Sequence, residues 1–234
     1  MALSPSELRQ TLKGMVGQRK SYQDHAWIQR YIQGELSQSQ VRLWVEQHYY
    51  IVGNVHDIFG PIYTGCSDPG VRVRILENLM EEETGRSTGS TAHRELMCQL
   101  IEALGGTRQQ IAQLHPLPET VARRSFIRLV ARTRPFYEAL AAISLAGKAQ
   151  FGDMAGTYAA VGQERYGLSA DATTFWSVHA TADKEHGAAA YDIVTQWART
   201  DEQQQNVIES IPQSLELAWC WFDGFVRATA SQDG

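Results

Sequence analysis

Apolar side chains recur at helical spacing along most of this chain, and no stretch shows the strict alternation of a half-buried β-strand. In the segment VRLWVEQHYYIVGNVHDIF, for example, Leu43, Tyr50, Val52 and Val55 mix with polar residues at a helical period. A chain with this pattern can bury its apolar residues only by packing helix against helix. The pattern therefore predicts an all-α protein.

Residues that start and stop helices frame these segments. Ser4-Pro5-Ser6-Glu7 has the composition of a capping box, and Ser37 to Gln40 repeats that logic. Gly85 and the pair Gly105-Gly106 are placed to end helices. Further helices are expected over residues 70–83, 93–104, 108–114, 118–133, 136–156, 170–199 and 202–230. Short loops and the lack of an internal repeat predict one compact helical domain over residues 1–234, with a frayed tail at the end.

Composition narrows the class of function. The chain has 234 residues and a net charge of −5, with no long basic run and no apolar stretch long enough to span a membrane. We therefore expect neither nucleic acid nor a membrane as a partner. The opening residues MALSPSELRQ lack the pattern of a signal peptide, which favours a cytoplasmic location. Cys66, Cys98 and Cys220 fit reduced thiols, and Cys220 is expected to be buried.

The segment FWSVHATADKEHG carries the most specific chemical signal. His179, Asp183 and His186 share one stripe of a helix, because their spacing is i, i+4, i+7. One helix supplies too few ligands for a metal, so others must come from facing helices. The best candidates lie in LMEEETGRSTGSTAHREL, where three glutamates end one helix and His93 begins the next.

Such a mixture of carboxylates and imidazoles suits iron or manganese in a helical bundle. A plainer interpretation competes with it. A His–Asp pair one turn apart is often a surface hydrogen bond, and a run of glutamates is often a solvated helix end. The residues alone leave both interpretations open.

Several segments together resemble the heme-oxygenase-like diiron oxidase superfamily. Two branches are most similar: the iron-dependent para-aminobenzoate-making proteins and the pyrroloquinoline quinone synthase family. The resemblance rests on GELSQSQVRLWVEQHYY, on NLMEEETG followed by RELMCQLIEALG, and on the intact HxxxDxxH. It implies a heme-oxygenase-like bundle of about seven or eight helices. It also implies one or two irons per chain, with these ligands: Glu82, His93, His179, Asp183 and His186.

The resemblance further implies an oxidase or oxygenase that activates dioxygen. The expected substrate is a small amine, amino acid or aromatic metabolite of a biosynthetic pathway. The resemblance also implies a homodimer, because members of the family tend to form dimers. Tyr50 belongs to the family's tyrosine pair and is expected to hydrogen-bond the substrate, whereas His25 matches a pocket histidine. A buried histidine with a hydrogen-bond partner is the competing interpretation of His25.

The chain departs from the family at three positions. Diiron members carry a bridging Glu about 31 to 32 residues before the first His of HxxxDxxH, and here that position holds Lys148. An ammonium repels a metal cation, so Lys148 indicates a single-iron or weakened site, or else a substrate-binding or catalytic amine. The para-aminobenzoate makers consume a tyrosine and a lysine of their own, which align with Ile28 and Tyr158. This chain is therefore not expected to follow that self-consuming route.

Two alternatives stay open from the sequence. One is a metal-free oxidase like the quinone synthases, in which His179 and His186 move protons and Lys148 binds a carboxylate. The other is a non-catalytic helical interaction or regulatory protein, which the missing Glu favours modestly. Iron content separates both alternatives from the oxidase.

Overall fold

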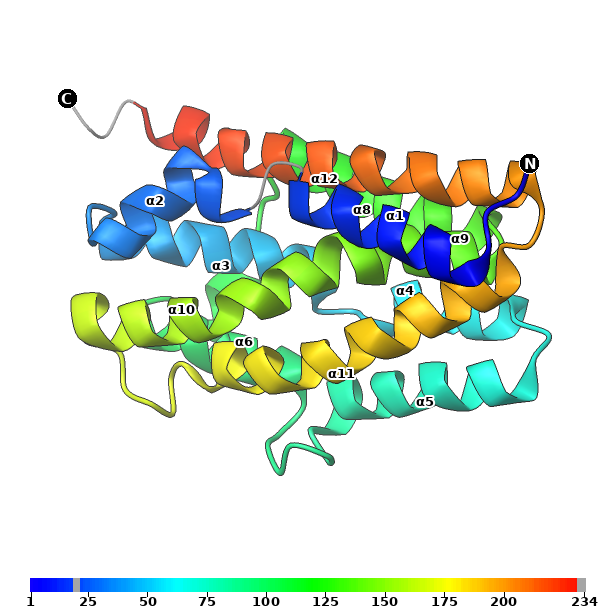
Figure 1. The fold of residues 1–234 in the computed structure, drawn as a ribbon. Coiled ribbons are helices and arrows are strands. Elements are labelled where there is room, and N and C mark those ends of the chain that lie inside the picture. The colour runs from blue at the N-terminus through cyan, green and yellow to red at the C-terminus, as the bar shows by residue number, and fades with distance from the viewer. Residues whose placement is uncertain (19–21, 231–234) are drawn as a thin grey trace.

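The computed structural model describes residues 1–18 and 22–230, without the side chains of residues 181–188. All regular secondary structure within that range is helical, so the all-α prediction is confirmed (Figure 1). The helices in the first half are α1 (Pro5–Gln18), η1 (Tyr22–Asp24), α2 (Ala26–Gln33), α3 (Gln38–Val52), α4 (His56–Gly65), α5 (Pro69–Thr84) and α6 (His93–Ala103). Those in the second half are α7 (Arg108–Ala112), α8 (Pro118–Thr133), α9 (Phe136–Leu140), the π-helix η2 (Ala141–Lys148), α10 (Ala149–Tyr166), α11 (Thr174–Trp197) and α12 (Asp201–Thr229).

The expected seven or eight helices are too few for the described part of the chain. Short helices such as α2 and α7 stand between the long ones, and the expected helix through residues 41–59 is two helices, α3 and α4. The break falls at Gly53, a residue type that weakens a helix. In addition, the helix expected from residue 136 changes its winding at η2, which divides it into three elements.

Both expected capping boxes are present. The Ser37 hydroxyl accepts a hydrogen bond from the Gln40 backbone N–H, and the Gln40 side chain accepts one from the Ser37 N–H. Ser4 and Glu7 exchange the same pair of hydrogen bonds before α1. These contacts satisfy backbone donors that a helix start leaves without partners, which explains why the boundaries were readable from the sequence.

The long helices α5, α11 and α12 run along the length of the molecule, with α12 on the side opposite α5 (Figure 1). Helix α11 packs against α10 and η2, and it also contacts α5 and α6. Helix α12 packs against η2 and α8. The π-helix therefore lies in the interior, between α11 and α12.

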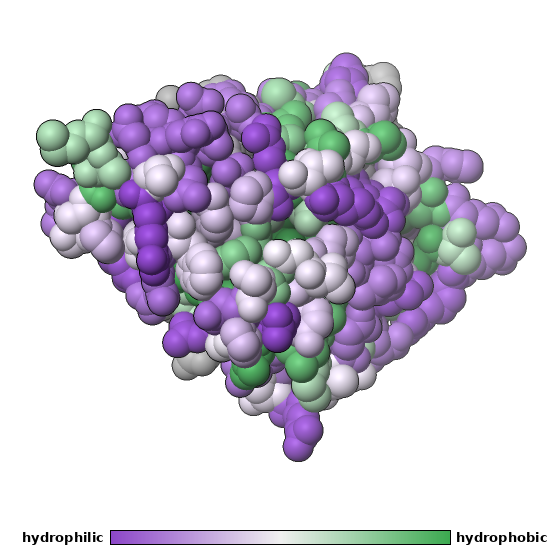
Figure 2. Space-filling view, turned by 90° about the vertical axis from the view of Figure 1, so that its right-hand side faces the viewer, coloured by the Kyte–Doolittle hydropathy of each residue, from purple (hydrophilic) through white to green (hydrophobic). Residues whose placement is uncertain are grey.

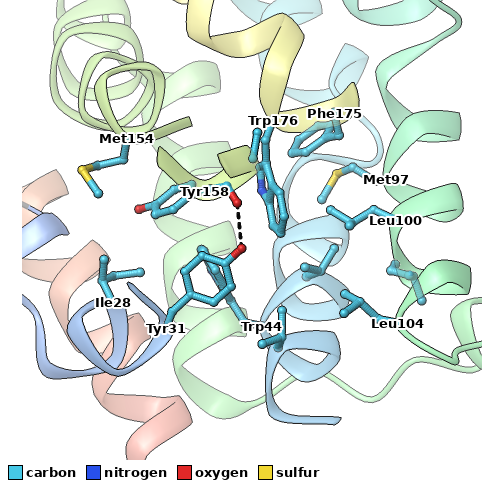
Figure 3. Packing of buried hydrophobic residues seen from close by; sticks show 14 of the residues in the cluster. Ile28, Tyr31, Trp44, Met97, Leu100, Leu104, Met154, Tyr158, Phe175 and Trp176 are labelled. Carbon is cyan, nitrogen blue, oxygen red and sulfur yellow. Dashed lines mark hydrogen bonds between the residues drawn. The ribbon is translucent and has the colours of Figure 1, made fainter. Parts of the chain in front are cut away.

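The buried hydrophobic residues form two clusters. The first contains Tyr31, Trp44, Tyr158 and Trp176, whose rings pack edge to face or stacked (Figure 3). Within it, the Tyr31 hydroxyl donates to the backbone carbonyl of Tyr158 at 2.7 Å. The second cluster gathers residues of α1, α4, α5, α8, α9, η2, the last half of α11 and the first half of α12.

The surface differs from one sequence expectation. Cys220 is exposed, whereas Trp221 and Phe222 next to it are buried. Successive residues of a helix point about 100° apart, so the apolar stretch WCWF cannot turn every side chain inward. On the face shown in Figure 2, hydrophobic residues form small separate patches among hydrophilic ones. None of the described helices combines the length and apolar character needed to cross a membrane.

Candidate metal centre

The loop between α5 and α6 is folded tightly against the end of α5. Gly85 ends that helix with φ of 63°, and a Cβ there would lie 2.4 Å from the Ser90 hydroxyl oxygen. The Glu81 carboxylate accepts hydrogen bonds from the Ser87 N–H at 2.6 Å and the Thr88 hydroxyl at 2.6 Å. These contacts turn the chain back, so that His93 at the start of α6 lies beside the last turn of α5.

Glu82, His93 and His179 come together from α5, α6 and α11. The Glu82 Oε2 atom lies 2.9 Å from His93 Nδ1, and the His93 and His179 rings have centroids 4.6 Å apart. One ligand atom from each of the three residues lies within 4.8 Å of the others. Both histidines are buried. The inward orientation expected for His179 is therefore observed.

Each histidine has a hydrogen bond that orients its ring on the side away from the other donors. His179 Nδ1 lies 2.6 Å from the Phe175 carbonyl oxygen, so an Nδ1–H donates there and Nε2 carries the lone pair. His93 Nε2 lies 3.3 Å from Glu81 Oε1. Histidines that bind metals usually donate their other N–H to a carbonyl or a carboxylate in this way. Burial lowers the pKa of His93, but Glu82 and Glu81 outweigh it and raise that pKa above its ordinary value.

The two glutamates are held as anions for different reasons. Burial opposes the charge of Glu81, but its hydrogen bonds from Ser87 and Thr88 prevail and lower its pKa to about 2. Burial also opposes the charge of Glu82, yet the Lys148 ammonium and the His93 imidazole hold the pKa of Glu82 well below its ordinary value. Both carboxylates can therefore serve as anionic acceptors at neutral pH.

Lys148 lies on the other side of Glu82. Its Nζ atom is 2.7 Å from Glu82 Oε1 and 3.1 Å from Asn78 Oδ1. Lys148 is the last residue of the π-helix η2, a rare winding that often marks functional sites. Lys148 thus places its positive charge directly beside the candidate ligand Glu82.

Asp183 and His186 belong to the helical stretch of α11, but their side chains lie outside the described residues. Their assignment as ligands stays a prediction. Tyr50 is not among the described residues that line the cavity beside the cluster, and its ring lies 4.4 Å from the Arg124 guanidinium carbon. His25 is buried as the N-cap of α2, where its Nδ1 accepts from the Trp27 N–H.

A cavity of about 100 Å³ opens beside the cluster. Glu82, His93, Lys148 and His179 form part of its wall, and most of the remainder is apolar or aromatic. Both hydrophobic clusters contribute, for instance Met97 from the first and Ile143 from the second. The candidate centre therefore lies where the two halves of the core meet.

This arrangement fits a transition metal. It offers one carboxylate and two imidazoles at close range, in a buried place and with hydrogen bonds behind each histidine. Mixed nitrogen and oxygen donors of this type suit iron or manganese.

Comparison with known proteins agrees with the site. Residues 42–219 match the model of a family described as an iron-containing redox enzyme. The chain belongs to this family. Membership places the protein among the oxidoreductases.

Two of the relatives found by sequence comparison are 4-aminobenzoate synthases. The protein from Nitrosomonas europaea is 27% identical over 232 residues, covering 95% of this chain and 92% of the relative. The one from Chlamydia pneumoniae is 22% identical over 209 residues, covering 88% and 89%. A domain of unknown function with a heme oxygenase-like fold from Shewanella denitrificans superposes with a TM-score of 0.79 at 16% identity, covering 100% of this chain and 97% of that one. The heme-oxygenase-like superfamily expected from the sequence is therefore confirmed.

Sequence reasoning overlooked several residues around the centre of this redox enzyme. Glu81 supports His93, Asn78 accepts from Lys148, and Phe151 packs its ring 5.4 Å from that of His179. Glu81 is one of three adjacent glutamates, of which the family resemblance names only Glu82 as a ligand, and only the fold shows that Glu81 supports His93. Asn78 and Phe151 have no sequence signal, because neither belongs to a motif of metal ligands.

Proposed function

We propose that this protein is an iron-dependent oxidase that uses dioxygen to oxidise a small amine, amino acid or aromatic metabolite in a biosynthetic pathway. The observation that carries the proposal is the convergence of Glu82, His93 and His179 on the wall of a buried cavity. The family of iron-containing redox enzymes supports the choice of metal. The 4-aminobenzoate synthase relatives support a biosynthetic role.

Iron would be held by Glu82, His93 and His179, joined by Asp183 and His186 from the same helix α11. Bound iron would supply the redox chemistry with dioxygen that amino-acid side chains lack. The Phe175 carbonyl fixes the tautomer of His179, and Glu81 orients His93. These contacts hold the donor atoms ready, so that less reorganisation is required when the metal binds.

Lys148 supports one iron per chain rather than two. Its ammonium lies 2.7 Å from Glu82 Oε1 and already offsets the charge of this carboxylate. A positive charge this close disfavours a further cation in a buried place. Lys148 also lines the cavity, which makes it the candidate catalytic amine.

An external substrate is favoured over the chain's own residues. The tyrosine and lysine expected of self-consuming relatives are Ile28 and Tyr158 in this chain, and both are fully buried. Most of the cavity wall is apolar or aromatic, which limits the number of water molecules around the reacting groups.

The same ion pair favours a second candidate, a metal-free oxidase. If Lys148 satisfies Glu82 permanently, the two histidines would move protons instead of binding iron. The deciding measurement is iron content after anaerobic purification with ferrous iron, followed by dioxygen uptake on exposure to air. The iron-dependent oxidase hypothesis predicts about one iron per chain. It also predicts that the protein takes up dioxygen only when iron is bound.

Variants make this measurement specific. His179→Ala and Asp183→Ala are each expected to lose iron and dioxygen uptake while keeping their helical content. His115→Ala is the matched control, because that histidine is exposed and lies outside the cavity. Full iron content in both site variants would refute the proposed ligands, and an iron-free parent protein would favour the metal-free oxidase.

A further inference from the structure

Three buried polar atoms without hydrogen-bond partners belong to residues that line the cavity. Eight such side-chain atoms occur in the described part of the chain, and these three are Arg123 Nη1, Trp44 Nε1 and Tyr158 Oη. Buried polar groups are nearly always hydrogen-bonded, so a cluster of exceptions in one cavity needs a cause. A bound ligand that accepts hydrogen bonds supplies one.

Arg123 is held so that part of its guanidinium is left for a ligand. Its Nη2 donates to the Tyr22 hydroxyl at 3.0 Å, and its Cζ lies 4.5 Å from the centre of the Trp221 ring. No carboxylate of the described residues forms an ion pair with it. A half-buried guanidinium without an anionic partner is unfavourable, and a ligand carboxylate can take two parallel hydrogen bonds from it.

The other two groups are also donors. The indole N–H of Trp44 can only donate. Burial raises the pKa of Tyr158 well above its ordinary value, so its hydroxyl keeps the proton and can donate as well. The carboxylate of a ligand has two oxygens with room for about four hydrogen bonds, which is enough for all three groups.

Aromatic rings join this group to the metal centre. The Phe151 ring lies 5.4 Å from that of His179 and 6.0 Å from that of Tyr158. The His48 ring provides a second connection. Its centroid lies 4.9 Å from that of Phe151 and 5.7 Å from that of Trp221, and Arg123 stacks on the Trp221 ring. The two polar regions of the cavity are thus separated by a short apolar and aromatic stretch.

We propose that the cavity binds a small carboxylic acid, with its carboxylate on Arg123, Tyr158 and Trp44 and its apolar body directed toward Glu82, His93 and His179. This inference rests on the proposed function, because it names the substrate class of that same site. Lys148 is not the carboxylate anchor, since its ammonium already contacts Glu82 and Asn78. The cavity volume of about 100 Å³ limits the substrate to a small acid.

The test is a calorimetric titration of the whole chain with benzoate. Neutral benzamide is titrated in the same way as the matched probe. We expect benzoate to bind the parent protein and benzamide to bind at least tenfold more weakly. Arg123→Gln should weaken benzoate binding at least tenfold, because a hydrogen bond to a charged group is worth about 1.5 to 3 kcal/mol. Tyr158→Phe, which removes a single hydroxyl, should weaken it by a smaller factor.

Arg124→Gln is the control, because that arginine is adjacent in α8 but stacks on Tyr50 outside the cavity lining. It should bind benzoate like the parent. Equal benzoate binding by the parent, Arg123→Gln and Tyr158→Phe would overturn the proposal. So would the lack of benzoate binding by the parent, or equal binding of benzamide.

Iron content keeps this test separate from that of the proposed function. Arg123 offers no ligand to a metal, so Arg123→Gln should bind as much iron as the parent. If the parent protein binds no iron but binds benzoate more tightly than Arg123→Gln does, the carboxylate site is supported and the iron-dependent oxidase is refuted. If the parent protein binds iron and Arg123→Gln binds benzoate as tightly as the parent, the iron-dependent oxidase is supported and the carboxylate site is refuted.

Discussion

Glu82 is the residue on which the alternatives for this protein depend. One of its oxygens faces His93 and the other faces Lys148, so the same carboxylate can complete an ion pair or bind a metal. Its side chain is only 12% exposed, and that of Lys148 is 19% exposed. A buried charge that loses its partner is destabilising by about 3 to 5 kcal/mol, so Glu82 requires a cation in either state.

Lys148→Glu tests which cation Glu82 prefers. The substitution replaces the ammonium with a second carboxylate at the position where the family resemblance predicts one. We expect iron content to rise from about one toward about two per chain, measured by titration with ferrous iron under anaerobic conditions. The iron-free variant should be less stable than the parent, because two carboxylates then face each other.

Lys148→Gln is the control for this change, since it removes the charge without adding a strong ligand. Its iron content should stay near that of the parent. If Lys148→Glu also binds the parental amount of iron with parental affinity, Lys148 does not hold the position of the missing ligand.

Among the elements, the continuous helix through α9, η2 and α10 contributes several side chains to the site. Its π-helical segment ends at Lys148, and α10 continues through Phe151 and Tyr158 along the cavity. Two glycines on this helix differ in their surroundings. A Cβ on Gly147 would meet no atom within 4 Å, whereas one on Gly162 would lie 3.0 Å from the Trp176 ring and 3.2 Å from the Tyr31 hydroxyl oxygen.

Alanine substitutions at these two glycines should therefore have opposite effects. Gly147→Ala should raise the free energy of unfolding by about 0.5 to 1 kcal/mol, because alanine favours a helix and has room there. Gly162→Ala should lower it by about 1 to 3 kcal/mol, since the added methyl group overpacks the aromatic core. Urea denaturation followed by circular dichroism measures both changes. A stabilising Gly162→Ala would contradict the packing described here.

Across the whole molecule, the candidate centre connects α5 and α6 with α11, which is far from them in sequence. Its three donors come from α5, α6 and α11, and its cavity is lined by both hydrophobic clusters. A ligand that binds only the folded state stabilises that state by mass action. Iron should therefore act as a link between the two halves of the core.

Ferrous iron should raise the melting temperature under anaerobic conditions. At a free concentration one hundred times Kd the gain is about 2.7 kcal/mol, or roughly 5 to 10 °C for a chain of this size. Removal of iron with a chelator should reverse the shift. His179→Ala should melt at the same temperature with and without iron, and an equal shift in that variant would place the metal elsewhere.

The all-helical class and most helix positions were determined by the sequence alone, because their causes are local. The capping boxes at Ser4 and Ser37 and the stop at Gly85 act within a few residues of the chain. The number of helices was underestimated for two reasons. Glycine weakens a helix without always ending it, so the break at Gly53 also depends on packing, as does the π-helical winding of η2. Periodicity records which residues are apolar, and the fold decides where a long helix divides.

The candidate site divides in the same way. Glu82, His93 and His179 were named from motifs and a family resemblance, and the fold brings one donor atom from each within 4.8 Å of the others. The contacts of Lys148 and the unpaired donors of Arg123 and Tyr158 were decided only by the tertiary structure. A motif records ligands that lie at fixed spacing along one helix. Groups on separate helices become neighbours only when those helices pack, so no local pattern in the sequence reveals them.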